Sequence, residues 1–263
     1  MLCLYYVMLY LQVEVLHCDS AVQCFVCVTT NHQSDRDVLA VLAATERGHL
    51  VTWKLELCHD GNTVSARRMN RLALHVPNPV LNLVSTVDGT SLASGCCFMM
   101  FDVASKLSIR RSARGAVKVW RTSDLLDGPI DEDISPVCTK TTGQLFIRAR
   151  HTNEAHRPRT SPVGARSFGI RGLAFTPDGG KLAVGFGYPT GCPLRLEPDV
   201  LSLCCAETLA VLWTMRENNF NVCDLRFSRK GTGGRRSPWQ LVVSTERSIG
   251  KVAIYHRHQR RKY

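Results

Sequence analysis

The sequence lacks the short motifs that would identify a hydrolase or a secreted glycoprotein. It contains no Gly-x-Ser-x-Gly nucleophile motif, and its nine histidines are scattered, with no recognisable Ser or Cys nucleophile motif beside them. It also contains no Asn-x-Ser/Thr sequon for glycosylation. We therefore expect a protein without catalytic residues, whose role is binding rather than chemistry.

A disulfide framework and a zinc-binding pattern are also missing. The twelve cysteines have no regular spacing, and several lie in apolar segments, where a free thiol acts as a small hydrophobic group (Cys204, Cys205 and Cys223). Cys24 and Cys27 form a single Cys-x-x-Cys pair, and in a strand their thiols would point to opposite faces. The sequence therefore predicts a reduced, cytoplasmic protein without a bound metal.

The apolar N-terminal run is too short to cross a bilayer. It extends from Met1 to Val13 and ends at Glu14, whereas a spanning helix needs about 20 residues. A positive start and a small-residue cleavage site, which signal peptides carry, are absent. Alternating apolar residues over 22–28 favour a strand instead. We expect no membrane partner, and a secreted or membrane-anchored protein remains a third hypothesis.

The glycine-rich stretches do not match phosphate-binding loops. Residues 185–191 lie between two expected strands, whereas a dinucleotide fingerprint joins a strand to a helix. Gly179-Gly180-Lys181 lacks the upstream Gly and the following Ser/Thr of a P-loop. We expect no cofactor.

The chain contains an internal repeat. Residues 80–95 (VLNLVSTVDGTSLASG) align without a gap with residues 170–185 (IRGLAFTPDGGKLAVG) at an offset of 90, and a third copy begins at Val222. Seven of the sixteen pairs are identical: Leu83/Leu173, Thr86/Thr176, Asp88/Asp178, Gly89/Gly179, Leu92/Leu182, Ala93/Ala183 and Gly95/Gly185. Alternating apolar residues before and after Asp-Gly predict two strands joined by a tight turn, with small residues that let neighbouring strands pack closely.

A second element follows downstream of these hairpins. Residues 48–54 (GHLVTWK) and 115–121 (GAVKVWR) share Gly-x-Leu/Val-x-x-Trp-Lys/Arg, and residues 250–256 (GKVAIYH) fit with Tyr in the Trp position. We interpret seven residues of the two elements as structural: Trp53, Asp88, Gly89, Trp120, Asp178, Gly179 and Tyr255. The two tryptophans are interpreted as strand packing.

The order of these elements resembles WD40 repeats, in which a hydrophobic strand, Ser/Thr-Pro-Asp-Gly, Leu-Ala-x-Gly and Gly-x-Val-x-x-Trp follow one another. The resemblance implies an all-β WD40-type β-propeller, partial or irregular, with about four to six blades and basic loop insertions. The offset of 90 is about twice the period of 40–45 residues for one blade. Lys54 and Arg121 stand where the family has the Asp of its Trp-Asp dipeptide.

Residues 168–257 resemble more narrowly the propellers of the echinoderm microtubule-associated protein-like (EML) family. The matching segments are LAFTPDGGKLAVGFG, Ala206-Glu207-Thr208-Leu209 and Asp224-Leu225-Arg226-Phe227-Ser228. Between them we expect a strand over 199–204, a turn over 206–209 and an outer strand over 210–213. The resemblance implies a scaffold that binds protein partners at the cytoskeleton or the cilium.

We expect three regions along the chain. Residues 1–37 form an apolar N-terminal segment or a degenerate blade, 38–257 the propeller, and 258–263 a basic tail. Blade-like units are expected at 38–58, 63–126, 167–216 and 217–257, and 127–166 is a loop or a degenerate blade in which 144–147 is strand-like. Residues 98–114 interrupt the second unit as an insertion.

Positive charge dominates the turns and insertions. The net charge is +11, with an isoelectric point of about 9.3. Such charge favours an acidic partner, although solvated basic loops would explain it equally well. The candidate partner-binding residues are Arg110, Arg111, Arg114, Arg229, Lys230, Arg235 and Arg236.

Protein partners, tubulin or another acidic surface, are the first hypothesis. An RNA- or ribosome-associated protein that binds nucleic acid through the same loops is the alternative, and charge is its only support.

Overall fold

Four antiparallel β-sheets dominate the computed structural model, which describes residues 18, 20–30, 37–57, 64–76, 78–96, 115–127, 134–141, 144–145, 169–187, 199–217, 222–229, 239–245 and 249–253. The first sheet contains β1 (Val22–Thr30), β2 (Asp37–Thr45), β3 (His49–Leu57) and β4 (Val64–Ala73). The second contains β5 (Val80–Ser85), β6 (Ser91–Cys96), β7 (Ala116–Arg121) and β8 (Cys138–Thr141), with helix α2 (Thr122–Asp127) between the last two. The third contains β9 (Gly169–Phe175), β10 (Lys181–Gly187), β11 (Asp199–Cys205) and β12 (Val211–Glu217). The fourth contains β13 (Val222–Arg229), β14 (Trp239–Thr245) and β15 (Ile249–Ala253).

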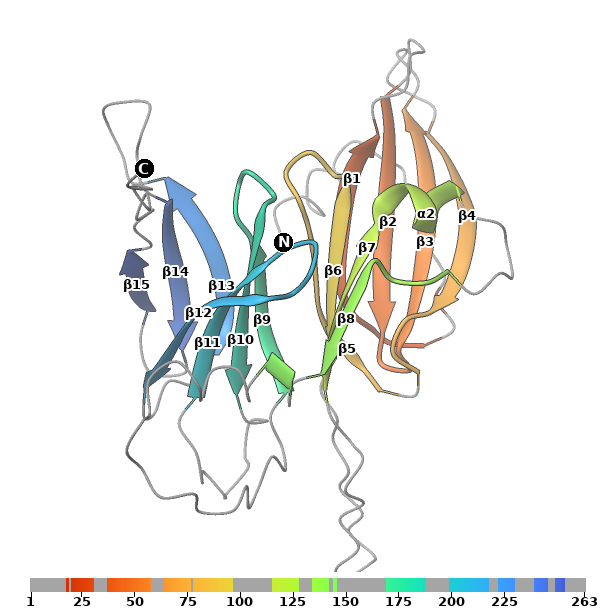
Figure 1. The fold of residues 1–263 in the computed structure, drawn as a ribbon. Coiled ribbons are helices and arrows are strands. Elements are labelled where there is room, and N and C mark those ends of the chain that lie inside the picture. Colours follow the sequence, from red (N-terminus) through yellow and green to blue (C-terminus); the bar gives the residue numbers. More distant parts are fainter. Residues whose placement is uncertain are drawn as a thin grey trace, which may run out of the picture.

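Figure 1 shows the four sheets side by side in chain order, from β1–β4 to β13–β15. In each sheet every strand pairs with the next strand along the chain. The first strands of neighbouring sheets contact one another, β1 with β5, β5 with β9 and β9 with β13. Consecutive sheets of this kind, packed with their first strands together, are the blades of a β-propeller. The predicted all-β propeller class is therefore confirmed.

Apolar layers fill the space between the sheets. Leu42 and Leu92 belong to the layer between the first and second sheets, Val119 and Leu182 to the layer between the second and third, and Ala183 and Leu241 to the layer between the third and fourth. Full burial of one such leucine contributes about 1.5–3 kcal/mol of hydrophobic free energy. The stability of the stack therefore comes from contacts between sheets as well as from the hydrogen-bonded ladders within them.

The two copies of the repeat occupy equivalent places in the second and third sheets. Leu92 and Leu182 are fully buried, and each packs in the layer towards the preceding sheet. Ala93 and Ala183 are also fully buried, and each packs in the layer towards the following sheet. The Leu-Ala pair thus serves both faces of one strand, which explains why both residues recur at the offset of 90.

Both Asp-Gly pairs lie in tight turns, and both glycines have a φ of 70°. The Asp88 carboxylate accepts hydrogen bonds from the backbone N–H and the hydroxyl of Thr90 at 3.1 and 2.9 Å. Asp178 accepts the corresponding backbone hydrogen bond in its own turn at 3.2 Å. A positive φ suits glycine, because a side chain there would crowd the following carbonyl.

We expect Gly89→Ala to destabilise the protein more than Gly179→Ala. Each change forces a positive φ on alanine, which costs about 1–2 kcal/mol. A Cβ at Gly89 would also lie 2.4 Å from Val28 Cγ1, whereas a Cβ at Gly179 would lie 3.3 Å from Thr86 Cγ2. Urea unfolding of the two variants measures the difference, and Val28→Ala should relieve part of the cost of Gly89→Ala. Equal losses in the two variants would contradict this steric account.

The first sheet extends beyond the expected unit at 38–58 in both directions, and it includes the strand that the alternation over 22–28 predicts. Residues 22–30, expected as part of an apolar segment or degenerate blade, form β1 and pair with β2 along its length. Residues 64–73, expected to open the second unit, form β4 and pair with β3. The segment 64–73 is rich in arginine and lacks apolar alternation, because an outer strand has one edge and much of its surface in water.

The region expected as a loop or degenerate blade at 127–166 contributes to the second sheet. Its residues 138–141 form β8, the outer strand, and residues 144–145 lie in a helical turn rather than in a strand. The expected strand at 199–204, turn at 206–209 and outer strand beginning near 210 are confirmed by β11 and β12. The insertion at 98–114 and the basic tail at 258–263 lie outside the described residues.

Candidate functional site

The candidate partner-binding residues lie almost entirely outside the part of the chain that the structure describes. Arg229 is the last residue of β13, and the other six fall in 97–114 and 230–238. Their role therefore stays a prediction. Of the seven structural residues, Tyr255 also lies outside the described ranges.

Both predicted structural tryptophans are buried in third strands. Trp53 in β3 is 4% exposed and packs on one face of the first sheet, away from the layer shared with the second sheet. Trp120 in β7 is 3% exposed and packs in the layer between the first and second sheets. Both indoles therefore lie in packed apolar layers, and Trp120 has a polar role as well.

A buried hydrogen-bond network surrounds Trp120. Its indole N–H donates to Ser94 Oγ in β6 at 3.1 Å, and the same Oγ lies 2.9 Å from His75 Nε2. His75 belongs to the connection from β4 to β5, so the network joins that connection to the second sheet. All three residues are buried, where a satisfied network helps to specify one arrangement of the chain.

His75 acts as a structural residue rather than as an acid or base. Burial, together with the nearby charge of Lys118, lowers the pKa of His75 to about 3. Its imidazole is therefore neutral around pH 7. A general acid or base would need a pKa close to the working pH.

A small pocket lies beside this network. Its volume is about 280 Å³. One wall is the β4–β5 connection and the other is the pair of strands β6 and β7; the lining residues are Ala73, Leu74, His75, Val76, Asn78, Cys96, Ala116 and Lys118. The predicted insertion at 98–114 lies between these two strands in the sequence, so residues that line the pocket lie near both of its ends.

Lys118 supplies the charge of the pocket. Its Nζ donates a hydrogen bond to the Leu74 carbonyl oxygen and lies 5.7 Å from the centre of the Trp120 ring. Burial lowers the pKa of Lys118 from its ordinary value. The Cys96 Sγ accepts a hydrogen bond from the Ala116 N–H at 3.2 Å, and burial raises the pKa of that thiol. The thiol is thus protonated, and the pocket is suited to binding rather than to nucleophilic chemistry.

Sequence reasoning missed this pocket, although a signal for it exists. When the Gly-x-Leu/Val-x-x-Trp elements are aligned on their aromatic residue, the position of Lys118 is Val51 in the first copy and Ala253 in the last. Val51 is 1% exposed. A cation where other copies have an apolar residue marks a local departure from the repeat that strand formation does not require.

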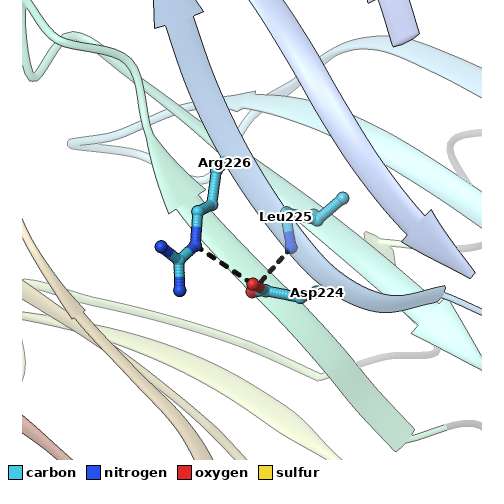
Figure 2. Close-up of polar contacts among 3 residues, drawn as sticks. All are labelled: Asp224, Leu225 and Arg226. Atoms are coloured by element: carbon cyan, nitrogen blue, oxygen red, sulfur yellow. Dashed lines mark hydrogen bonds and ion pairs between the residues drawn. The ribbon is translucent and has the colours of Figure 1, made fainter. Parts of the chain in front are cut away.

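The segment 224–228 of β13, which is part of the resemblance to EML propellers, has its buried and exposed side chains on opposite faces of the strand. Leu225 is 2% exposed and packs in the layer between the third and fourth sheets. As Figure 2 shows, Asp224 Oδ2 pairs with Arg226 Nε at 3.1 Å, and Asp224 Oδ1 accepts the Leu225 N–H at 2.8 Å. The side chains of Asp224 and Arg226 are 54% and 83% exposed, so their ion pair adds little to stability.

The Cys-x-x-Cys pair is divided between two faces, as the sequence predicts. Cys24 packs in the layer between the first and second sheets, whereas Cys27 packs on the opposite face of the first sheet. Within the described residues, no group of three or more His, Cys, Asp or Glu side chains could hold a metal ion. No helix in that part of the chain is long and apolar enough to cross a membrane.

The fold defines the chain as a β-propeller protein. No family model and no curated protein matches the chain. Among solved structures, Sqt1 of Chaetomium thermophilum is 15% identical, with 81% of this chain and 40% of that chain covered and a TM-score of 0.45. The structure of BBS1N in complex with ARL6DN is 13% identical, with 90% and 54% covered and a TM-score of 0.42. The β-propeller domain of the Trilobed protease from Pyrococcus furiosus is 10% identical, with 86% and 57% covered and a TM-score of 0.29. The chain thus spans 40% to 57% of the length of these structures.

Proposed function

We propose that this chain is a non-catalytic WD40 propeller scaffold that binds an acidic protein partner, with the microtubule and its acidic tubulin tails as the first partner to test. The observation that carries the proposal is the blade stack itself, whose interior is filled by apolar layers. A filled interior leaves binding to the loops and edges of the blades. The resemblance of residues 168–257 to EML propellers supports the choice of a cytoskeletal or ciliary partner.

Electrostatics supplies the proposed mode of binding. The net charge of +11 attracts acidic surfaces and raises the rate of encounter with them. Several cations lie close together in the sequence of these segments, so they can meet one acidic segment of a partner. The proposed contacts are Arg110, Arg111, Arg114, Arg229, Lys230, Arg235 and Arg236.

We expect the purified chain to co-sediment saturably with microtubules, and the affinity to fall steeply as salt is added. The Debye length is about 8 Å at physiological salt and shortens as salt is added. Exposed charges that lie further apart than this length attract one another only weakly. Removing the acidic tubulin tails should have the same effect as added salt. Co-sedimentation across a salt series, with intact and tail-cleaved microtubules, measures both.

Charge-matched variants separate a defined patch from general attraction. The double change Arg235→Glu and Arg236→Glu should weaken pelleting more than the same reversal at Arg67 and Arg121, two exposed arginines of β4 and β7. Equal weakening by the two pairs of changes would show that the attraction is non-specific. The absence of pelleting by folded protein would show that tubulin is not the partner. Adding RNA to the assay tests the alternative, because an RNA-binding protein would leave the microtubules and show a log-linear dependence on salt.

A further inference from the structure

The pocket beside Trp120 is small and can take an inserted side chain. Its volume of about 280 Å³ lies below the roughly 300–1,000 Å³ of pockets that enclose drug-sized ligands. The β4–β5 connection forms one wall, so the pocket opens where two neighbouring blades meet. Val76, one of the lining residues, is 49% exposed and offers an apolar contact at the rim.

Within the described residues, the charge in the pocket has no acidic partner. Lys118 is the one Lys, Arg, Asp or Glu among the described lining residues, and it contacts the Leu74 carbonyl and the Trp120 ring. A carbonyl and a ring face stabilise an ammonium group less than a carboxylate does in the same place. Burial without a paired anion is consistent with the lowered pKa of Lys118.

The side chain of Asn78 offers a further donor for a ligand. The His75 Nε2 is engaged by Ser94, and the Cys96 Sγ by the Ala116 N–H. The side-chain amide of Asn78 has no hydrogen bond within the described residues, and it lines the same pocket as Lys118. An amide N–H and an ammonium group together suit a carboxylate, whose two oxygens accept hydrogen bonds.

We infer that the Lys118 pocket binds the carboxylate of an aspartate or glutamate side chain that a partner protein inserts between the first and second sheets. The inference rests on the proposed function in assuming a protein partner with an acidic surface, and it assigns one specific contact to that partner. Lys118 donates to the carboxylate, Asn78 donates to its second oxygen, and the stem of the inserted side chain packs on Val76. A lysine at this position is not needed for the strand, because the other copies have Val51 and Ala253 there.

The test uses a fluorescently labelled hexaglutamate peptide and fluorescence anisotropy on the full chain. We expect saturable binding, weakened about tenfold or more by Lys118→Met, because the variant removes the paired charge and keeps the length of the side chain. Lys140→Met in β8 is the matched control, because it lowers the net charge equally and Lys140, which pairs with Val117 on the neighbouring strand, is not a lining residue. It should change the dissociation constant less than twofold.

A second variant acts without removing the lysine. Asn78→Asp is nearly isosteric and places a carboxylate inside the pocket, where it pairs with Lys118 and excludes the ligand. We expect it to lose peptide binding at least as fully as Lys118→Met while retaining the thermal stability of the parent protein. In the parent protein, N-acetylglutamate should compete with the peptide, and N-acetylglutamine should not.

The outcomes separate this inference from the proposed function. Three outcomes would overturn the inference that the pocket binds a carboxylate. They are equal weakening by Lys118→Met and Lys140→Met, unchanged binding in Asn78→Asp, and no saturable peptide binding by the folded protein. Microtubule pelleting of the same variants is scored independently. Pocket-dependent peptide binding without microtubule pelleting would contradict tubulin as the partner and support the carboxylate site. Pelleting that is insensitive to Lys118→Met would support tubulin as the partner and show that the pocket does not contact it.

Discussion

Replacing Gly185 or Gly95 with alanine is expected to lower the free energy of unfolding by about 1–3 kcal/mol in each case, the range for overpacking a well-filled core. A Cβ at Gly185 would lie 2.6 Å from Val222 Cγ1, and a Cβ at Gly95 would lie 2.6 Å from Ile170 Cγ2. Both contacts are far shorter than van der Waals contact. Valine and isoleucine are also branched at Cβ, so they have few rotamers into which they can move away. Urea unfolding followed by circular dichroism measures the loss.

The two glycines act at different interfaces, which makes the prediction specific. Because Gly95 has no side chain, the first strand of the third sheet can pack closely against it. Gly185 allows the same close approach of the first strand of the fourth sheet. The clashing residues differ, Ile170 for Gly95 and Val222 for Gly185, so the double variant should lose more stability than either single variant.

A control and a compensating change test the steric cause of these losses. Gly180→Ala should change stability by less than about 0.5 kcal/mol, because a Cβ there would meet only Asp178, at 3.7 Å. Val222→Ala should cost less in the Gly185→Ala background than alone, because it removes the clashing methyl group. A Gly185→Ala variant as stable as the parent would show that the sheets shift apart at little cost.

The repeated hairpins could be predicted from the sequence because their determinants are local. Asp88 and Gly89 define a turn by their own conformational preferences, and the residues on either side alternate in step with the two faces of a strand. The pair Gly95 and Gly185 is a further case, because a residue without a side chain at the same place in two strands indicates close approach of a neighbour.

The outer strands and the polar network could not be predicted in the same way. β4 carries arginines and little apolar alternation, so its assignment to the first sheet depends on pairing with β3 rather than on its own pattern. His75, Ser94 and Trp120 are separated by 19 and 26 residues and come from three elements. The sequence pattern of each segment does not predict such a contact, because the contact forms only when the β4–β5 connection lies against the second sheet.

The protein is expected to lose stability in mild acid through His75. Its folded-state pKa of about 3 lies below the value of about 6.5 for histidine in an unfolded chain, so the unfolded state binds more protons between these limits. The stability that the neutral imidazole provides is fully present above about pH 6.5 and falls as the pH drops towards 3. The slope for one such group is about 1.4 kcal/mol per pH unit, or about 2 kcal/mol between pH 7 and pH 5. Urea unfolding at a series of pH values measures it.

Two variants distinguish this titration from the other groups that ionise in the same range. His75→Gln keeps a polar side chain beside Ser94 but cannot gain a proton, so its stability should decline less steeply than that of the parent below pH 6.5. Ser94→Ala removes the hydroxyl that links His75 to Trp120 and leaves the imidazole buried. Its stability should be lower at every pH with the steep decline retained, because burial is the main cause of the lowered pKa. Parallel pH profiles for His75→Gln and the parent would show that His75 is not the group that titrates, and that the network accepts a charged imidazole.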